Sequence, residues 1–221
     1  MKGGLLQKIV NGLRGALAGL CLLLGLTTIH GDAIAAPVRV LMLGDSLTAG
    51  YGLPVPESLP SQLETVLKGQ GLDVAILNGG VSGDTTAGGL ARLDWALSDN
   101  PDYALVALGA NDALRGLSPE RAYENLDRII TKLKAKGVKV MILGMLAPLN
   151  LGKEYRETFA GIFPKLAEKH RVPLYPFLLD GVALDPKLNQ PDGIHPNAEG
   201  VKIIAGRLAP LVKQLLETPP G

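Results

Sequence analysis

The sequence predicts an α/β fold: a three-layer α/β/α sandwich around a central, mainly parallel sheet of five strands. Short, nearly continuous apolar runs alternate with longer amphipathic stretches from residue 37 onward. Such apolar runs are typical of strands buried on both faces of a parallel sheet. Parallel neighbours need crossover connections, and the amphipathic stretches supply them as helices. Strands are expected at 38–43, 74–77, 103–108, 138–143 and 172–175.

Helices are expected between these strands and after the last one. The helix expected at 118–136 has a start signal, because Ser118 can cap it and Pro119 suits its first position. A final helix is expected to open at Asn197. Its apolar residues are spaced three and four apart, which is one face of a helix: they are Val201, Ile204, Leu208, Leu211 and Leu215. The earlier helices are expected at 57–69, 86–98, 118–136 and 154–170.

The first 36 residues have the pattern of a signal peptide, which leaves one domain at 37–221. Positive charges at Lys2, Lys8 and Arg14 precede an apolar run at 16–29. This run is shorter than the roughly 20 apolar residues that span a membrane.

Small residues at the end of this segment suit a signal peptidase, with cleavage expected after Ala35 or alternatively after Ala36. The pattern predicts a periplasmic or secreted protein with no stable membrane anchor after cleavage. An uncleaved segment that anchors the protein is the alternative.

Composition excludes several classes of protein. The 221 residues include 22 Lys and Arg against 21 Asp and Glu, so there is no basic excess for binding nucleic acid. The single cysteine, Cys21, lies in the expected signal peptide, so the domain would fold without disulfides. A chain of this length buries roughly 70% of the surface that its unfolded form exposes, which suffices for a core without a metal. We expect a monomer with no metal and no cofactor.

Unusual polar residues gather where the expected strands end. Ligands of open α/β sheets bind at the carboxyl ends of the strands, so the loops there should carry the chemistry. Each segment alone would suit an ordinary turn, but their joint placement favours a site. The segments are 44–50, 78–85, 109–112 and 192–197.

A histidine base can be assigned by elimination. His30 lies in the expected signal peptide, and His170 ends a helix, where it suits the helix dipole. His195 remains, with Asp192 three residues before it. This spacing lets the carboxylate hold one imidazole nitrogen while the other takes a proton from Ser46. A turn in which Asp192 bonds its own backbone is the alternative.

Three groups are candidate donors to a developing oxyanion. The backbone N–H of Ser46 opens a helix, a position that favours negative charge. The Gly83 N–H and the Asn111 side-chain amide follow the neighbouring strands. Glycine suits position 83 because a backbone donor must approach the substrate without a Cβ in the way.

These motifs resemble the four blocks of the SGNH or GDSL hydrolases, in order: 44–47, Gly83 within 82–85, 109–112 and 192–195. The resemblance spans nearly the whole domain and implies a flavodoxin-like SGNH hydrolase fold. It implies Ser46 as nucleophile, His195 as base and Asp192 as the residue that orients it. It also implies an oxyanion hole made of Ser46, Gly83 and Asn111.

Within that family, the chain is similar to bacterial periplasmic enzymes that act as thioesterases, lysophospholipases and arylesterases. The resemblance therefore implies a serine hydrolase of small-molecule esters and thioesters. The chain departs from the pattern of this subgroup in two segments, 79–80 and 149–151. Both differences are expected to touch only the rim of the site. Leu114 and Leu149 are the candidate substrate-binding residues of an apolar group that includes Leu117, Leu146 and Leu151. Simple packing under the loops explains such residues equally well.

Two other functions remain as alternatives. A carbohydrate O-deacetylase would use the same chemistry, but only 4% of the residues are aromatic and sugars usually stack on rings. A non-enzymatic phosphate- or nucleotide-binding module would use the 44–52 loop as an anion nest, but the chain lacks a phosphate-binding glycine fingerprint. Metal-dependent hydrolysis is disfavoured, because one free histidine cannot assemble the usual ligand set.

Overall fold

A computed structural model describes residues 36–217 of the chain. The apolar part of the expected signal peptide and the cleavage position at Ala35 lie outside this range. Among the described residues, no helix is both long enough and apolar enough to cross a bilayer.

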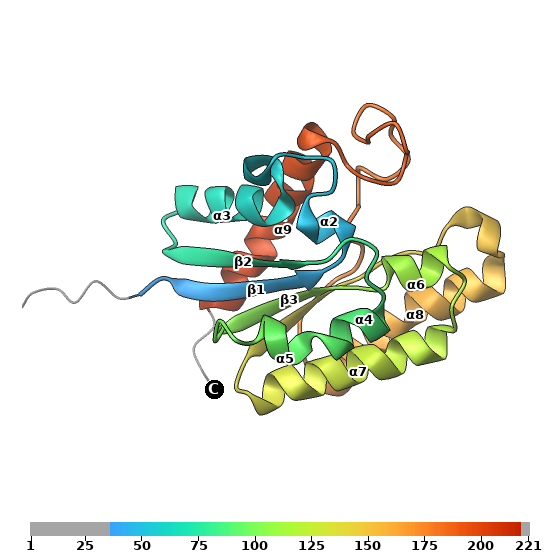
Figure 1. Ribbon diagram of the computed structural model, residues 1–221, viewed down its shortest axis with the longest axis horizontal. Helices are drawn as coiled ribbons and strands as arrows, with labels where there is room; N and C mark the ends of the chain where they lie inside the picture. Colours follow the sequence, from blue (N-terminus) through green and yellow to red (C-terminus); the bar gives the residue numbers. More distant parts are fainter. Residues whose placement is uncertain (1–35, 218–221) are drawn as a thin grey trace, which may run out of the picture. The chain divides into compact units, whose positions relative to one another are not determined.

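The sheet has five strands in the order β2-β1-β3-β4-β5, and every neighbouring pair is parallel (Figure 1). The prediction of a five-stranded, mainly parallel sheet is therefore confirmed. The strands are β1 (Val38–Gly44), β2 (Val74–Gly80), β3 (Tyr103–Ala107), β4 (Lys139–Leu143) and β5 (Leu174–Tyr175).

The strand sequences explain why this sheet forms. The inner part of β1 is fully buried, with Val40, Met42 and Leu43 at 0% exposure. Strands β3 and β4 show the same pattern, with every residue after the first one buried. Burial on both faces requires a helix layer on each side, because each face would otherwise expose apolar surface to water.

Helices cover both faces of the sheet, which gives the three expected layers (Figure 1). On one face, α3 (Leu59–Gly69) packs against α9 (Ala198–Glu217). On the other, α7 (Pro119–Ala135) packs against α4 (Thr86–Ala91) and α8 (Lys153–His170). The predicted cap is present, since Ser118 Oγ accepts a hydrogen bond from Arg121 N at 3.2 Å.

The helix expected at 86–98 is instead two short helices, α4 and α5 (Leu93–Ala96). They are separated by Arg92, whose backbone leaves the helical region at φ −100° and ψ 7°. The predicted opening of the last helix at Asn197 is confirmed, because Asn197 Oδ1 accepts hydrogen bonds from Glu199 N and Gly200 N.

The expectation that residues 79–80 touch only the rim is wrong. Strand β2 continues to Gly80, so Gly79 pairs with Leu43 and Gly80 with Gly44 inside the sheet. A Cβ on Gly80 would lie 2.2 Å from the backbone nitrogen of Ala49. Glycine is therefore needed here so that the segment after β1 can lie directly on the end of β2.

Four short elements lie in the loops that follow the strands: α2 (Ser46–Ala49), η1 (Val55–Glu57), α6 (Ala110–Leu114) and η2 (Leu149–Leu151). Helices α2 and α6 begin within three residues of the ends of β1 and β3. The carboxyl edge of the sheet thus presents the polar segments that the sequence indicated.

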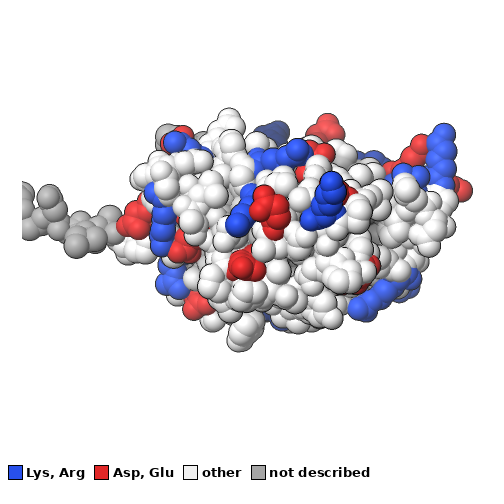
Figure 2. All heavy atoms as spheres, turned by 90° about the horizontal axis from the view of Figure 1, so that it is seen from above, with Lys and Arg blue, Asp and Glu red and all other residues white. Residues whose placement is uncertain are grey.

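Lys and Arg side chains are interspersed with Asp and Glu on the face seen from above, between broad uncharged areas (Figure 2). In this view the described residues form no extended patch of a single sign. The distribution matches a near-zero net charge and gives this face no strong attraction for a polyanion.

Candidate active site

Ser46 is the first residue of α2 and comes two residues after β1 ends. Asp45 caps this helix, with its Oδ1 accepting a hydrogen bond from Leu47 N at 3.0 Å. The helix ends at Gly50, whose left-handed backbone (φ 82°) closes the turn. The expected helix opening at Ser46 is thus present, and it points the serine into the loops above the sheet edge.

His195 connects Ser46 to Asp192 by hydrogen bonds at both ring nitrogens. Nε2 lies 2.9 Å from Ser46 Oγ, and Nδ1 lies 2.7 Å from Asp192 Oδ2. A carboxylate only accepts, so Nδ1 carries the proton and Nε2 is left to accept from the serine hydroxyl. The structure therefore brings together the three residues expected to form a triad.

Asp192 also organises its own turn, as the alternative interpretation anticipated. Its Oδ1 accepts hydrogen bonds from Ile194 N and His195 N, both at 3.1 Å. The hydrogen bond from His195, together with these backbone donors, lowers the pKa of Asp192 to about 2. The carboxylate consequently stays ionised and can serve both the turn and the imidazole.

A second set of contacts holds the loop that carries His195. Gln190 N donates to the carbonyl of His195 at 2.7 Å, and Gln190 Nε2 donates to the carbonyls of Tyr51 and Pro196. The Tyr51 ring lies against the imidazole, with 4.6 Å between ring centroids. The imidazole position therefore does not depend on Asp192 alone.

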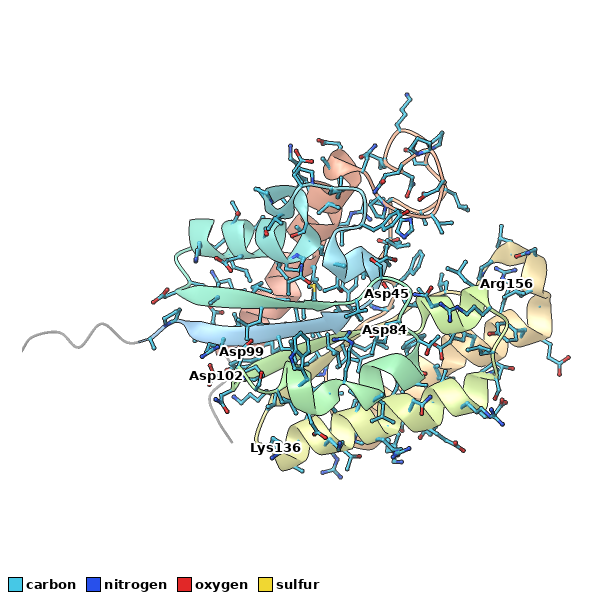
Figure 3. The ribbon with its side chains drawn as sticks, in the orientation of Figure 1. Asp45, Asp84, Asp99, Asp102, Lys136 and Arg156 are labelled. Atoms are coloured by element: carbon cyan, nitrogen blue, oxygen red, sulfur yellow. The ribbon has the colours of Figure 1, made fainter. Side chains whose placement is uncertain are left out.

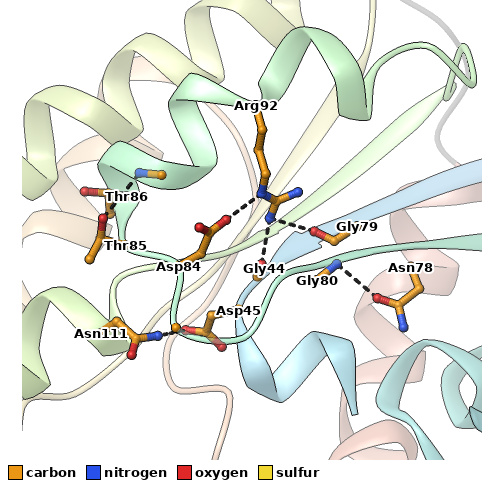
Figure 4. A network of polar contacts seen from close by, with 12 residues as sticks. Gly44, Asp45, Asn78, Gly79, Gly80, Asp84, Thr85, Thr86, Arg92 and Asn111 are labelled. Carbon is orange, nitrogen blue, oxygen red and sulfur yellow. Dashed lines mark hydrogen bonds and ion pairs between the residues drawn. The ribbon is translucent and has the colours of Figure 1, made fainter. Parts of the chain in front are cut away.

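Asn111 lies in α6 and contacts the residue before the nucleophile. Its Nδ2 donates to Asp45 Oδ2 at 3.3 Å (Figure 4). Asp45 is fully buried, and this burial raises its pKa to about 6 despite the hydrogen bonds from Leu47 and Asn111. Sequence reasoning missed Asp45, although its place next to Ser46 in the motif was a signal.

Gly83 lies in the loop after β2 with φ +84°, a conformation that side chains rarely adopt. A Cβ at this position would contact only the Arg115 guanidinium, at 3.6 Å. Backbone conformation is thus a second reason for glycine here. Arg115, at the end of α6, donates from Nη2 to the Gly83 carbonyl at 2.8 Å. This bond ties the loop that holds Gly83 to the helix that holds Asn111.

Arg92 joins the ends of two strands beneath the site (Figure 4). Its Nη2 donates to the carbonyls of Gly44 and Gly79 at 2.9 and 2.8 Å, and its Nε pairs with Asp84. Both partners of this ion pair are 16% exposed. One guanidinium thus connects the end of β1, the end of β2 and the residue after Gly83.

Asp112 has a structural role next to Asn111. It is buried and accepts hydrogen bonds from Thr86 N at 2.8 Å and Thr86 Oγ1 at 2.7 Å. These bonds attach α6 to the start of α4. The two neighbouring polar residues of the motif therefore have different roles: Asn111 lines the site, whereas Asp112 holds α6 against α4.

His170 is outside the site. It ends α8, as expected, and its Nε2 lies 2.7 Å from Asp127 Oδ1. Among residues 36–217, no group of three His, Cys, Asp or Glu side chains is arranged to hold a metal ion.

A mainly apolar cavity of about 270 Å³ lies beside Ser46, Asn111 and His195. Leu114 and Leu149 line it, as does Leu146, whereas neither Leu117 nor Leu151 is among its described lining residues. Gly83 is likewise not in the cavity wall. The large aliphatic side chains of the lining come from five segments of the chain: Leu47; Leu114; Met145, Leu146 and Leu149; Leu179 and Leu184; and Ile194.

The chain matches the model of the GDSL-like Lipase/Acylhydrolase family over residues 42–203. It is 44% identical to an arylesterase of Vibrio mimicus, over 83% of this chain and 92% of that protein. It is 38% identical to the thioesterase 1/protease 1/lysophospholipase L1 of Escherichia coli (strain K12), over 82% of this chain and 86% of that protein.

Solved structures support the same family assignment. The crystal structure of TesA superposes with a TM-score of 0.77 at 36% identity, covering 80% of this chain and 99% of that one. AlinE4, described as an SGNH-hydrolase family esterase, superposes with a TM-score of 0.69 at 45% identity, covering 82% and 98%.

The architecture and motifs are those of the SGNH hydrolases, the class to which AlinE4 is assigned. The chain belongs to the GDSL-like lipase/acylhydrolase family.

Proposed function

We propose that the protein is a serine hydrolase that cleaves carboxylic esters and thioesters by acyl transfer through Ser46, His195 and Asp192. The observation that carries this proposal is the unbroken line of hydrogen bonds from Ser46 Oγ to His195 at 2.9 Å and from His195 to Asp192 at 2.7 Å. A serine hydroxyl is a weak nucleophile until such a base removes its proton.

The reaction proceeds in two steps. Ser46 Oγ attacks the carbonyl carbon while its proton moves to His195 Nε2, and the carbonyl electrons pass to the oxygen. Collapse of this intermediate releases the alcohol or thiol, which takes the proton from His195 and leaves an acyl-serine. Water then attacks the acyl group with the same histidine as base, and a second collapse releases the acid and returns the proton to Ser46.

The developing oxyanion would be bound by the Ser46 N–H, the Gly83 N–H and the Asn111 amide. The Ser46 N–H lies at the start of α2, and Asn111 lines the same cavity as Ser46. The contact from Arg115 supports the role of Gly83, because it restrains the backbone of this residue. Donors already in position stabilise the charge without reorganisation during the reaction.

Cavity chemistry supports small apolar acyl or aryl substrates, with Leu114 and Leu149 as substrate-binding residues. The names of the relatives add aryl esters, thioesters and lysophospholipids as substrate classes. A carbohydrate O-deacetylase is less well supported, because the lining is mainly aliphatic and Phe177 is the one Phe, Tyr or Trp among its described residues.

We further propose that residues 1–36 direct export and that residues 37–221 act as a monomer in the periplasm or outside the cell. The positive start, short apolar run and small residues of the leader support this proposal.

Labelling of the purified domain with a fluorophosphonate tests the mechanism. The reagent transfers its phosphonyl group to an activated serine with loss of fluoride, so we expect stoichiometric modification of Ser46 that is lost in Ser46→Ala and strongly slowed in His195→Ala. Ser98→Ala replaces an exposed serine and serves as the matched control. A folded protein that is not labelled would refute the hydrolase mechanism and support a binding module.

A further inference from the structure

Arg156 brings a positive charge to the mainly apolar cavity. It lies in the first turns of α8, and its side chain runs from that helix towards α6 (Figure 3). It lines the same cavity as Ser46 and His195. A cation therefore faces the space that would receive substrate.

This cation has no counter-ion among residues 36–217. The Arg156 Nε is buried without a hydrogen-bond partner among the described residues, and no ion pair is formed by its guanidinium there. Arg92 and Arg207, by contrast, each pair with an aspartate. A buried polar group that lacks a partner costs free energy, more so when it is charged, so its retention at a site suggests a partner that is supplied by ligand.

The walls of the cavity do not offset the charge. No acidic side chain is among the described residues that line it. Aliphatic walls exclude water and weaken screening, which strengthens any interaction between the guanidinium and an anion. The site therefore combines apolar contacts near Ser46 with a single cation.

We propose that Arg156 is a specificity-determining residue that binds an anionic oxygen group of the substrate, so that the cavity accepts esters that carry a carboxylate on the acyl chain or a phosphate on the leaving group. The planar guanidinium presents paired N–H donors that match the oxygens of either group. This inference rests on the proposed hydrolase function. The anion takes no part in bond breaking and serves to position the ester at Ser46.

Two pairs of esters test the proposal and distinguish the source of the anion. One pair is the mono-p-nitrophenyl ester of suberic acid and its neutral methyl ester, which differ in a carboxylate on the acyl chain. The other is octanoyl glycerol phosphate and octanoyl glycerol, which differ in a phosphate on the leaving group. The quantity measured is the ratio of kcat/KM for the anionic ester to kcat/KM for its neutral partner.

Arg156→Gln is expected to lower this ratio about tenfold or more in at least one pair, because a charge-assisted contact is lost. Arg156→Lys should retain part of the preference if charge matters, and it also guards against misfolding of the glutamine variant. Lys153→Gln removes a charge from the same helix at a side chain that is 86% exposed, and it should leave both ratios unchanged. Equal ratios in wild type and Arg156→Gln for both pairs would overturn the proposal.

Binding separates this proposal from the hydrolase mechanism. Calorimetry of Ser46→Ala with the two anionic esters and their neutral partners should show binding that favours the anion and that Arg156→Gln weakens. If no ester is hydrolysed by the wild type but this binding is present, the hydrolase function fails and the anion site stands. If esters are hydrolysed but neither binding nor kinetics depends on Arg156, the anion site alone is refuted.

Discussion

Asn111 Nδ2 donates to Asp45 Oδ2 at 3.3 Å, which connects a proposed oxyanion donor to the residue before the nucleophile. The other carboxylate oxygen of Asp45 accepts from Leu47 N in the first turn of α2. A carboxylate in this position fixes which end of the Asn111 amide faces it, because only the nitrogen can donate. The second hydrogen of that nitrogen then remains for substrate.

Replacing Asp45 by Asn should inactivate the protein without unfolding it. The new amide can keep its oxygen on Leu47 N, and its nitrogen then faces Asn111. Because two amide nitrogens cannot hydrogen-bond to each other, Asn111 must turn its own oxygen towards residue 45. Its nitrogen then no longer points to the substrate as a donor. We expect kcat to fall about 10²- to 10³-fold, as for loss of one oxyanion donor. Turnover of p-nitrophenyl acetate measures this, with Asp73→Asn as an exposed control. Unchanged kcat would mean that Asp45 does not orient Asn111.

The raised pKa of Asp45 predicts a pH-dependent stability. Its pKa is about 6 in the folded protein against an ordinary value of 3.8, so the folded state binds this proton more tightly. The contribution is fully present below pH 3.8 and is lost as pH rises through 6. It amounts to about 3 kcal/mol. Urea unfolding between pH 4 and 7 should show the free energy of unfolding of the wild type falling by most of this amount relative to that of Asp45→Asn. A pH-independent difference would contradict the burial of a titrating carboxyl.

Asn111→Ala should lower kcat about 10²- to 10³-fold while the protein stays folded. Unlike Asp45→Asn, it removes the donor itself and also leaves Asp45 with one hydrogen bond fewer. Steady-state turnover measures the loss of kcat, and thermal unfolding checks that the variant stays folded. Gln70→Ala, at an exposed position just after α3, removes an amide side chain that does not line the cavity and is the control. Wild-type turnover in Asn111→Ala would exclude this side chain from the oxyanion hole.

Asp192→Asn should lower kcat by about 10⁴. The amide can keep its oxygen on the two backbone donors, but its NH₂ then faces His195 Nδ1 and favours the tautomer that cannot accept from Ser46. Contacts from Gln190 and Tyr51 keep the imidazole in place, so the loss reports on proton position. Burst and steady-state kinetics measure the loss of kcat, with Asp185→Asn as the control variant. A loss below tenfold would indicate that Asp192 serves only its turn.

Arg92→Met should lower the free energy of unfolding by about 3–5 kcal/mol, because it leaves the Asp84 carboxylate largely buried and unpaired. Two strand-end carbonyls lose their donor as well. Arg39→Met is the control, since its ion pair with Asp99 is solvent-exposed at 3.7 Å and should contribute about 1 kcal/mol or less. Urea unfolding measures both. Equal losses would show that the Arg92 contacts do not support the strand ends.

Much of this arrangement was predictable because it follows from periodicity. Apolar runs identified all five strands, and parallel strands necessarily gather their carboxyl ends at one edge. Ser46 and His195 could therefore be expected to meet even though they are distant in sequence. The spacing of Asp192 and His195 also carried information, because three residues are enough for a carboxylate to turn back.

Other contacts depend on side-chain directions that the sequence does not reveal. Arg92 lies between two short helices and Arg156 lies on a long one, and the sequence alone does not distinguish their roles. Arg92 joins two strand ends, whereas Arg156 lines a cavity and its Nε has no hydrogen-bond partner among residues 36–217. The expectation for residues 79–80 is wrong because paired glycines usually mark a turn, whereas here both pair within the sheet and Gly80 allows α2 to lie on the strand. In each case, the deciding factor is the distance between elements that pack together.

The sequence separation of 149 between Ser46 and His195 also affects when the nucleophile becomes active during synthesis. Synthesis delivers the serine early and its base only after all five strands have been made. During that interval a nascent chain carries an inert hydroxyl, so activation of the nucleophile coincides with completion of the fold.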